Sequence, residues 1–146
     1  MVGNIKKQSG FTIVELLIVI VIIGILAAIT IVAYNGIQQR ARDSARTSDI
    51  AGIQKALELY RADNGDYPSV GSDNVGYNLS DLSAALVPKY INSIPNDPVT
   101  TFTNYQYVRG AAGSGAYGIR ISYETRTSCH RGVGNNGITW WGRPAC

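Results

Sequence analysis

The chain has 146 residues and a net charge of +3, with two cysteines and one histidine. This length allows one ordinary domain with an appendage, and a mean hydropathy of +0.01 averages two unlike parts. Residues 12–34 contain one charged residue, Glu15, whereas residues 35–146 contain nine Arg, two Lys, seven Asp and two Glu. Without Lys6 and Lys7 the net charge is +1, which is too small and too scattered to indicate a nucleic-acid-binding surface.

The segment FTIVELLIVIVIIGILAAITIVAY, residues 11–34, is apolar enough to cross a membrane as a helix. About 23 helical residues extend roughly 34 Å, whereas the hydrocarbon core of a bilayer is about 30 Å thick. Lys6 and Lys7 place the start of this segment on the cytoplasmic side. The run is too long for a secretory signal peptide. A plain membrane anchor leaves Glu15 unexplained, because an acidic side chain costs roughly 2.5 to 3.5 kcal/mol at the centre of a membrane.

The stretch KKQSG followed by FTIVELLIVIVIIGILAAI closely resembles the class III signal of type IV pilins and of the related pseudopilins of type II secretion. The resemblance implies that residues 1–10 are a basic leader, which a prepilin peptidase removes by cutting after Gly10. Phe11 would then be the N-terminal residue, usually N-methylated, and Glu15 would be the family glutamate. In the family, this glutamate pairs with the N-terminal amine of a neighbouring subunit in the filament.

The spacing of Phe11 and Glu15 agrees with that role. Residues four apart lie on nearly the same face of a helix, and cleavage would create a cationic amine at Phe11. An ion pair in an apolar medium favours the register in which the two charges meet. One residue departs from the pattern, since Val32 stands where many pilins have the proline of AIPxY. The local melting of the helix that the family owes to this proline region is therefore not implied here.

The helical pattern continues beyond Tyr34 with a polar character. Seven apolar residues recur at spacings of mostly three to five and predict a buried stripe: Ile37, Ala41, Ala45, Ile50, Ile53, Leu57 and Tyr60. We interpret the charged residues between them as a solvated face, namely Arg40, Arg42, Asp43, Arg46, Asp49, Lys55 and Glu58. The sequence DNGDYP, residues 63–68, then predicts a helix end near Asn64.

The rest of the chain predicts a short helix and an antiparallel sheet. We expect the helix at residues 80–86, with Ser80 as its N-cap. FTNYQYVRG and AYGIRISYET predict two strands joined by a glycine-rich turn, and GITWW, residues 137–141, predicts a third. One face of the second strand is expected to hold Tyr117, Ile119, Ile121 and Tyr123. The segment from LELYRADNGDYP to YQYV also resembles the part that follows the long helix in major pseudopilins and some short pilins.

The sequence offers little support for catalysis or metal binding. Cys129 and Cys146 fit one disulfide in an oxidising compartment. His130 is the only histidine, so neither a Ser-His-Asp nor a Cys-His arrangement is favoured, and we expect no enzyme. A metal site at these three residues would lack a fourth ligand. Asp97 and the carbonyls near it resemble the calcium loop of major pseudopilins, but DPVTTFTNYQY lacks the acidic and aromatic residues that mark that loop. We therefore predict no metal and no cofactor.

These observations predict an α+β chain with the pilin fold, in which a long N-terminal helix packs on a small antiparallel sheet. We divide the chain into a cleaved leader, a transmembrane and assembly segment, and an extracytoplasmic globular domain: 1–10, 11–34 and 35–146. Within the globular domain we expect an amphipathic helix, a connecting loop, and a sheet with a disulfide-closed C-terminal part: 35–64, 65–98 and 99–146.

The preferred interpretation is a structural subunit of a type IV pilus-like filament, held in the cell membrane by one helix and then extracted into a cell-surface filament. The first alternative is a pseudopilin of a type II secretion system or of a DNA-uptake system, the latter being the only route to a nucleic-acid partner. The second alternative is a membrane-tethered ligand-binding domain, suggested by Trp140, Trp141 and the tyrosine-rich loops. The expected partners are identical or related pilin subunits, the prepilin peptidase, the inner-membrane assembly platform, and membrane lipid before assembly.

Overall fold

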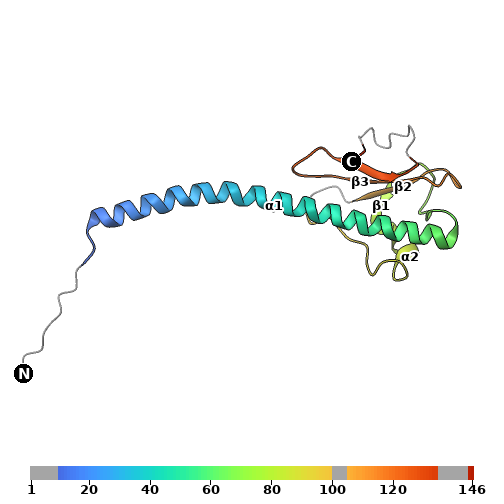
Figure 1. Cartoon of the computed structure of the whole chain (residues 1–146), viewed down its shortest axis with the longest axis horizontal. Coiled ribbons are helices and arrows are strands. Elements are labelled where there is room, and N and C mark those ends of the chain that lie inside the picture. Colours follow the sequence, from blue (N-terminus) through green and yellow to red (C-terminus); the bar gives the residue numbers. More distant parts are fainter. Residues whose placement is uncertain (1–9, 100–104, 135–144) are drawn as a thin grey trace, which may run out of the picture. The chain divides into compact units, whose positions relative to one another are not determined.

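The computed structural model describes residues 10–99, 105–134 and 145–146 (Figure 1). Its elements follow one another along the chain as α1 (Ile13–Asn64), β1 (Tyr77–Asn78), the 3-10 turn η1 (Leu79–Leu82), α2 (Ser83–Leu86), β2 (Gln106–Arg109), β3 (Tyr117–Ile121) and β4 (Cys129–Val133). The chain divides into two compact units, Met1–Gln38 and Gln39–Cys146. One long helix and one small antiparallel sheet confirm the predicted α+β pilin fold.

The helix α1 begins at Ile13 and ends at Asn64, close to both predicted ends. Gly65 closes it with a φ of 85°, and its N–H donates to the Arg61 carbonyl at 2.7 Å. Glycine adopts this left-handed conformation without the steric cost that a Cβ would bring, which is why it is common just after a helix.

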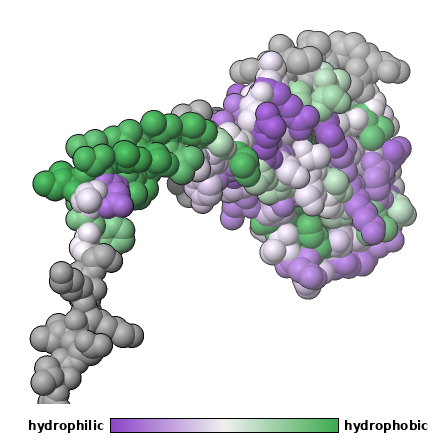
Figure 2. Space-filling view, turned by 60° about the vertical axis from the view of Figure 1, so that its left-hand side comes forward, coloured by the Kyte–Doolittle hydropathy of each residue, from purple (hydrophilic) through white to green (hydrophobic). Residues whose placement is uncertain are grey.

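In the N-terminal unit, α1 exposes mainly apolar side chains, with Glu15 as the one charged residue among residues 12–34. Phe11 is 92% exposed, and the Ile, Leu and Val side chains from Ile13 to Ile31 are between 50% and 84% exposed. Figure 2 shows most of the visible face of this part of the helix as hydrophobic, in green, with a hydrophilic patch near its start. Among the described residues, α1 is one helix long and apolar enough to cross a membrane by length and composition. Such a helix requires an apolar environment, and the part of the chain that the structure describes leaves it unburied.

The sheet of the second unit has the strand order β1-β2-β3-β4, and every neighbouring pair is antiparallel. The β2–β3 pair is the predicted hairpin, with Tyr107 opposite Ile119. The predicted strand at 137–141 lies outside the described residues. The strand β4 was not predicted, because CHRGV lacks the alternating apolar pattern of a half-buried strand. It contains Gly132, opposite Gly118, where an added Cβ would lie 1.9 Å from the Tyr117 carbonyl oxygen.

The core lies between the C-terminal part of α1 and the sheet. Ile50, Ile53 and Leu57 of the helix are fully buried in the same cluster as Ile119 and Ile121 of β3. Tyrosines fill much of the remaining core: Tyr67, Tyr105, Tyr107, Tyr117 and Tyr123. The four residues predicted to share one face of the second strand, Tyr117, Ile119, Ile121 and Tyr123, are all buried. The tyrosine-rich loops had suggested a ligand-binding surface, but these five tyrosines lie in the core.

Buried tyrosine hydroxyls need hydrogen-bond partners, and the fold supplies them. Tyr105 donates to Asp49 Oδ2 at 3.0 Å, and Tyr107 donates to the Pro68 carbonyl at 2.9 Å. Both contacts join segments that are far apart in the sequence, so the tyrosines connect α1 and the loop after it to β2 and to the residue just before β2.

The predicted apolar stripe on α1 is right from Ile50 onward and wrong before it. Ile37, Ala41 and Ala45 are exposed, whereas Asp43 and Arg46 are buried. The buried face keeps its helical spacing of three and four residues through positions 43, 46, 50, 53 and 57. Its first two residues are ionic because the chain opposite them presents carboxylates and backbone amides.

The short helix lies where it was predicted, but its start differs. Its residues form the 3-10 turn Leu79–Leu82 followed by α2, and the residue before the turn is Asn78. The predicted N-cap, Ser80, lies inside this turn and is wrong. Leu79, Leu82 and Leu86 are all buried, and the N-cap lies at Asn78, two residues before the predicted Ser80.

Candidate functional site

The predicted cleavage junction lies directly before α1. Gly10 and Phe11 are both exposed. A Cβ built on Gly10 would meet no atom within 4 Å, so the fold of this chain places no demand for glycine at position 10. Residues 1–9 of the predicted leader lie outside the described residues.

Thr12 and Glu15 form a capping box at the start of α1. The Glu15 N–H donates to Thr12 Oγ1 at 3.2 Å. In return, the Thr12 N–H and the Thr12 hydroxyl each donate to Glu15 Oε2 at 2.8 Å. This reciprocal arrangement satisfies two of the N–H groups that have no partner within a helix end. The sequence pattern of a capping box, T-x-x-E, is present in FTIVE. The sequence analysis did not predict this role for Thr12.

Phe11 and Glu15 lie on the same side of the chain, as the spacing predicted. Together with Leu16 and Val19 they line one surface hollow of about 330 Å³. Within the subunit the Glu15 carboxylate is bound by Thr12, and its pairing with the amine of another subunit's Phe11 stays a prediction. Both bonds from Thr12 end on Oε2, and a carboxylate can accept about four hydrogen bonds, so capacity for an external cation remains.

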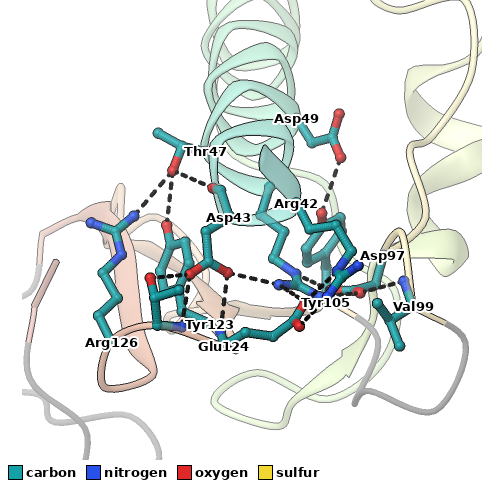
Figure 3. Close-up of polar contacts among 12 residues, drawn as sticks. Arg42, Asp43, Thr47, Asp49, Asp97, Val99, Tyr105, Tyr123, Glu124 and Arg126 are labelled. Atoms are coloured by element: carbon teal, nitrogen blue, oxygen red, sulfur yellow. Dashed lines mark hydrogen bonds and ion pairs between the residues drawn. The ribbon is translucent and has the colours of Figure 1, made fainter. Parts of the chain in front are cut away.

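A buried ionic cluster surrounds Arg46 in the second unit. Figure 3 labels the three carboxylates of this cluster, Asp43, Asp97 and Glu124. The Arg46 side chain is fully buried. Its Nε donates to Asp97 Oδ2 and its Nη2 donates to Asp97 Oδ1, both at 2.8 Å. Its Nη1 donates to Asp43 Oδ1 at 2.7 Å and to Glu124 Oε1 at 2.9 Å. One guanidinium group therefore joins carboxylates from α1, from the loop before β2 and from the segment after β3.

Asp43 binds the segment that follows β3. It accepts the Glu124 N–H at 3.0 Å, the Thr125 N–H at 2.9 Å and the Thr125 hydroxyl at 2.6 Å. Burial raises the pKa of Asp43, but these hydrogen bonds and the one from Arg46 outweigh burial and lower the pKa to about 2. The carboxylate is thus ionised in the folded protein at any ordinary pH.

Glu124 completes the cluster on its more exposed side. Arg42 donates from Nε to Glu124 Oε1 at 2.7 Å and from Nη2 to Oε2 at 2.6 Å. The hydrogen bond from Arg42, together with the one from Arg46, holds the pKa of Glu124 below its usual range. The interpretation of this part of α1 as a solvated charged face is therefore wrong for Asp43 and Arg46, which bind charged and polar groups in the interior.

Cys129 of β4 forms a disulfide with Cys146, and their Cα atoms are 5.1 Å apart. The Cys146 N–H donates to the His130 carbonyl at 3.0 Å, and Ala145 forms a parallel bridge with the same histidine. These contacts attach the last described residues to the edge of the sheet. His130 is buried at 4% exposure. Trp140 and Trp141 lie outside the described residues.

Two family models match this chain between residues 5 and 123. Residues 5–31 match the prokaryotic N-terminal methylation motif, and residues 33–123 match the family of type II secretion system protein G. The chain is 36% identical over 101 residues to the type II secretion system core protein G of Aeromonas hydrophila, covering 64% of this chain and 68% of that protein. It is 31% identical over 118 residues to the core protein G of Vibrio cholerae, covering 72% and 73%. No solved structure matches.

These comparisons support the pseudopilin alternative better than the type IV pilus subunit that we preferred from the sequence. The matched regions include the predicted leader junction, the amphipathic half of α1, and the strands β1, β2 and β3. The chain therefore belongs to the family of type II secretion system protein G, and it carries the N-terminal methylation motif of prepilin-like proteins.

Proposed function

We propose that the chain is a structural, non-catalytic subunit of a type II secretion filament, a pseudopilin that polymerises through residues 11–34. The observation that carries this proposal is the apolar surface of α1, where every Ile, Leu and Val from Ile13 to Ile31 is at least half exposed. Burying that surface is worth roughly 25 cal/mol per Å². Lipid would cover it before assembly, and the same helices of other pseudopilins would cover it afterwards.

Glu15 of the capping box would set the register in which the helices of neighbouring subunits pack. The Glu15 carboxylate is bound to Thr12 in the isolated subunit, so the charge can stay in the membrane at a reduced cost. Cleavage after Gly10 would add an ammonium group at Phe11, on the same side of the chain as Glu15. A new subunit would then be held in the register that brings its carboxylate to the amine of its neighbour, because an unpaired charge among apolar helices is costly.

The globular unit would be carried on the surface of the filament. It folds around its own core and closes its last described residues with a disulfide, which suits an oxidising extracytoplasmic compartment. The prepilin peptidase, the other pseudopilins and the inner-membrane assembly platform are the partners that we propose for processing and assembly.

The test is complementation in the producing organism. A strain lacking the gene is restored with the wild-type gene, with Glu15→Leu or with Glu15→Gln, and three quantities are measured: type II substrate secreted into the medium, surface pili, and subunit in the membrane. We expect the deletion to abolish secretion and leave pili intact. Both variants should insert and be cleaved normally yet restore little secretion.

A matched control uses Ile23→Leu, which keeps the same surface apolar and should restore secretion fully. Loss of pili with intact secretion would assign the chain to a type IV pilus instead. Full secretion from Glu15→Leu would contradict the pairing mechanism, and full secretion from the deletion strain would contradict the proposed function itself.

A further inference from the structure

The calcium loop that Asp97 resembles in the sequence does not fit the residues around it. Both oxygens of Asp97 are bound, Oδ2 by Arg46 Nε and Oδ1 by Arg46 Nη2, each at 2.8 Å. The Val99 N–H also donates to Oδ1 at 2.9 Å. Calcium takes six to eight oxygen ligands, and within the described ranges no group of three or more His, Cys, Asp or Glu is placed to hold a metal ion.

We propose that the Arg46 guanidinium is the fixed cation of this globular unit, so that its folded state needs no divalent metal ion. The three carboxylates that meet Arg46 come from α1, from the loop before β2 and from the segment after β3. Figure 3 shows Asp43, Asp97 and Glu124 converging beneath the helix. A bound metal ion can join separate segments in this way through their oxygens, and here a side chain does so.

Burial makes this arrangement mutually exclusive with a metal ion at Asp97. The side chains of Arg46 and Asp97 are 0% and 1% exposed, so no space open to solvent separates the two charges. A divalent ion on Asp97 would have to displace the guanidinium or lie against it, and like charges repel strongly in a medium of low dielectric constant. The planar guanidinium offers five N–H donors in a fixed geometry, and four of its hydrogen bonds here end on carboxylates.

The first experiment compares metal conditions in the wild-type protein. The full chain is purified in a nonionic detergent, and thermal unfolding is followed by near-ultraviolet circular dichroism, which reports the packing of the buried tyrosines. Melting is measured without additions, with millimolar calcium and with excess EDTA. The three values of Tm should agree within about 1 °C, because an ion that does not bind the folded state cannot stabilise it.

The second experiment compares variants of two arginines on the same helix. Arg46→Met should lower Tm by more than about 10 °C, since it leaves three carboxylates without their common cation. Arg40→Met is the matched control at an exposed position and should leave Tm nearly unchanged. Arg46→Lys should fall between them, because lysine keeps the charge and loses the bidentate contact with Asp97.

Two results would overturn the inference. One is a wild-type Tm that falls in EDTA and recovers with calcium, and the other is an Arg46→Met protein that melts with Arg40→Met. If Arg46→Met does not fold at all, the three metal conditions on the wild-type chain still decide the matter. None of these measurements depends on secretion or filament assembly.

Discussion

Thr12 and Glu15 bind each other across the first turn of α1, with each side chain accepting a backbone N–H of the other residue. The sequence pattern raised the question of why an apolar membrane segment contains a carboxylate. The structure answers it for the isolated subunit, where Glu15 caps its own helix through Thr12. The role that the family gives to Glu15 between subunits stays a prediction.

The cap makes a testable difference at Thr12. Thr12→Val keeps the shape of the side chain and removes the hydroxyl that accepts the Glu15 N–H. Loss of an N-cap costs about 1 kcal/mol, so hydrogen exchange of the Glu15 amide should be roughly fivefold faster. Nuclear magnetic resonance of the chain in micelles measures this rate. Thr12→Ser keeps the hydroxyl and should exchange like the wild type, while unchanged exchange in Thr12→Val would contradict the cap.

Processing can be separated from folding at Gly10. The mature protein should begin at Phe11 and be N-methylated there, as mass spectrometry of the membrane fraction would show. Gly10→Leu should leave full-length precursor in the membrane with a normally folded globular unit, because a Cβ at position 10 would have no atom of the described chain within 4 Å. A product that begins near Ile29 would point instead to an ordinary signal peptide.

Acid should weaken the globular unit through Asp43. The pKa of Asp43 is about 2 in the folded protein and about 3.9 in an unfolded chain. A lowered pKa contributes stability at pH values above the unfolded pKa. That contribution is about 2 to 3 kcal/mol, and it is lost as the pH falls from about 4 to about 2. Denaturant unfolding at several pH values measures it.

Two single variants, each replacing one aspartate, test this prediction. Asp43→Asn should be less stable at neutral pH and should lose less stability on acidification than the wild type. Asp81→Asn, at an exposed position, should reproduce the wild-type dependence on pH. An Asp43→Asn variant with the full acid dependence would show that other carboxylates carry the effect.

The disulfide should stabilise the globular unit by restricting the unfolded chain. The two cysteines are separated by 17 positions, and closing a loop of this length is worth about 3 kcal/mol in the chain-entropy model. The double variant Cys129→Ala, Cys146→Ala should lose about that much free energy of unfolding. Adding a reductant should weaken the wild type and leave the double variant unchanged. Two reactive thiols in the native wild type would disprove the bridge.

Gly132 tests the close approach of β4 to β3. An alanine Cβ there would lie 1.9 Å from the Tyr117 carbonyl oxygen, so the backbone must shift, at a cost of typically 1 to about 3 kcal/mol. The same chemical change at Gly52, inside α1 with nothing within 4 Å of its Cβ, should raise stability by up to about 1 kcal/mol. Equilibrium unfolding of both variants measures whether each substitution raises or lowers the free energy of unfolding. Equal effects would argue against a packing requirement for glycine at position 132.

The sequence by itself determined the features that depend on local pattern. The length of the apolar run, the end of α1 at Asn64 and Gly65, and the β2–β3 hairpin follow from hydrophobic period and from glycine in the left-handed region. The family resemblance also followed from contiguous residues around Gly10 and Glu15. The capping role of Thr12 could also have been predicted from the sequence, since the T-x-x-E pattern of a capping box is local.

Only the tertiary structure shows that the first buried residues of α1 in the globular unit are charged. Asp43 and Arg46 lie on the same helical face as Ile50 and Ile53, but their charge indicated a solvated surface. A buried charge is tolerated only when partners surround it, and the partners of Arg46 lie as far as 78 residues away in the chain. The helical period predicts which face of a helix a residue lies on, but it contains no information about the distant segments that pack against that face. For Arg46, those segments carry the carboxylates that make its burial possible.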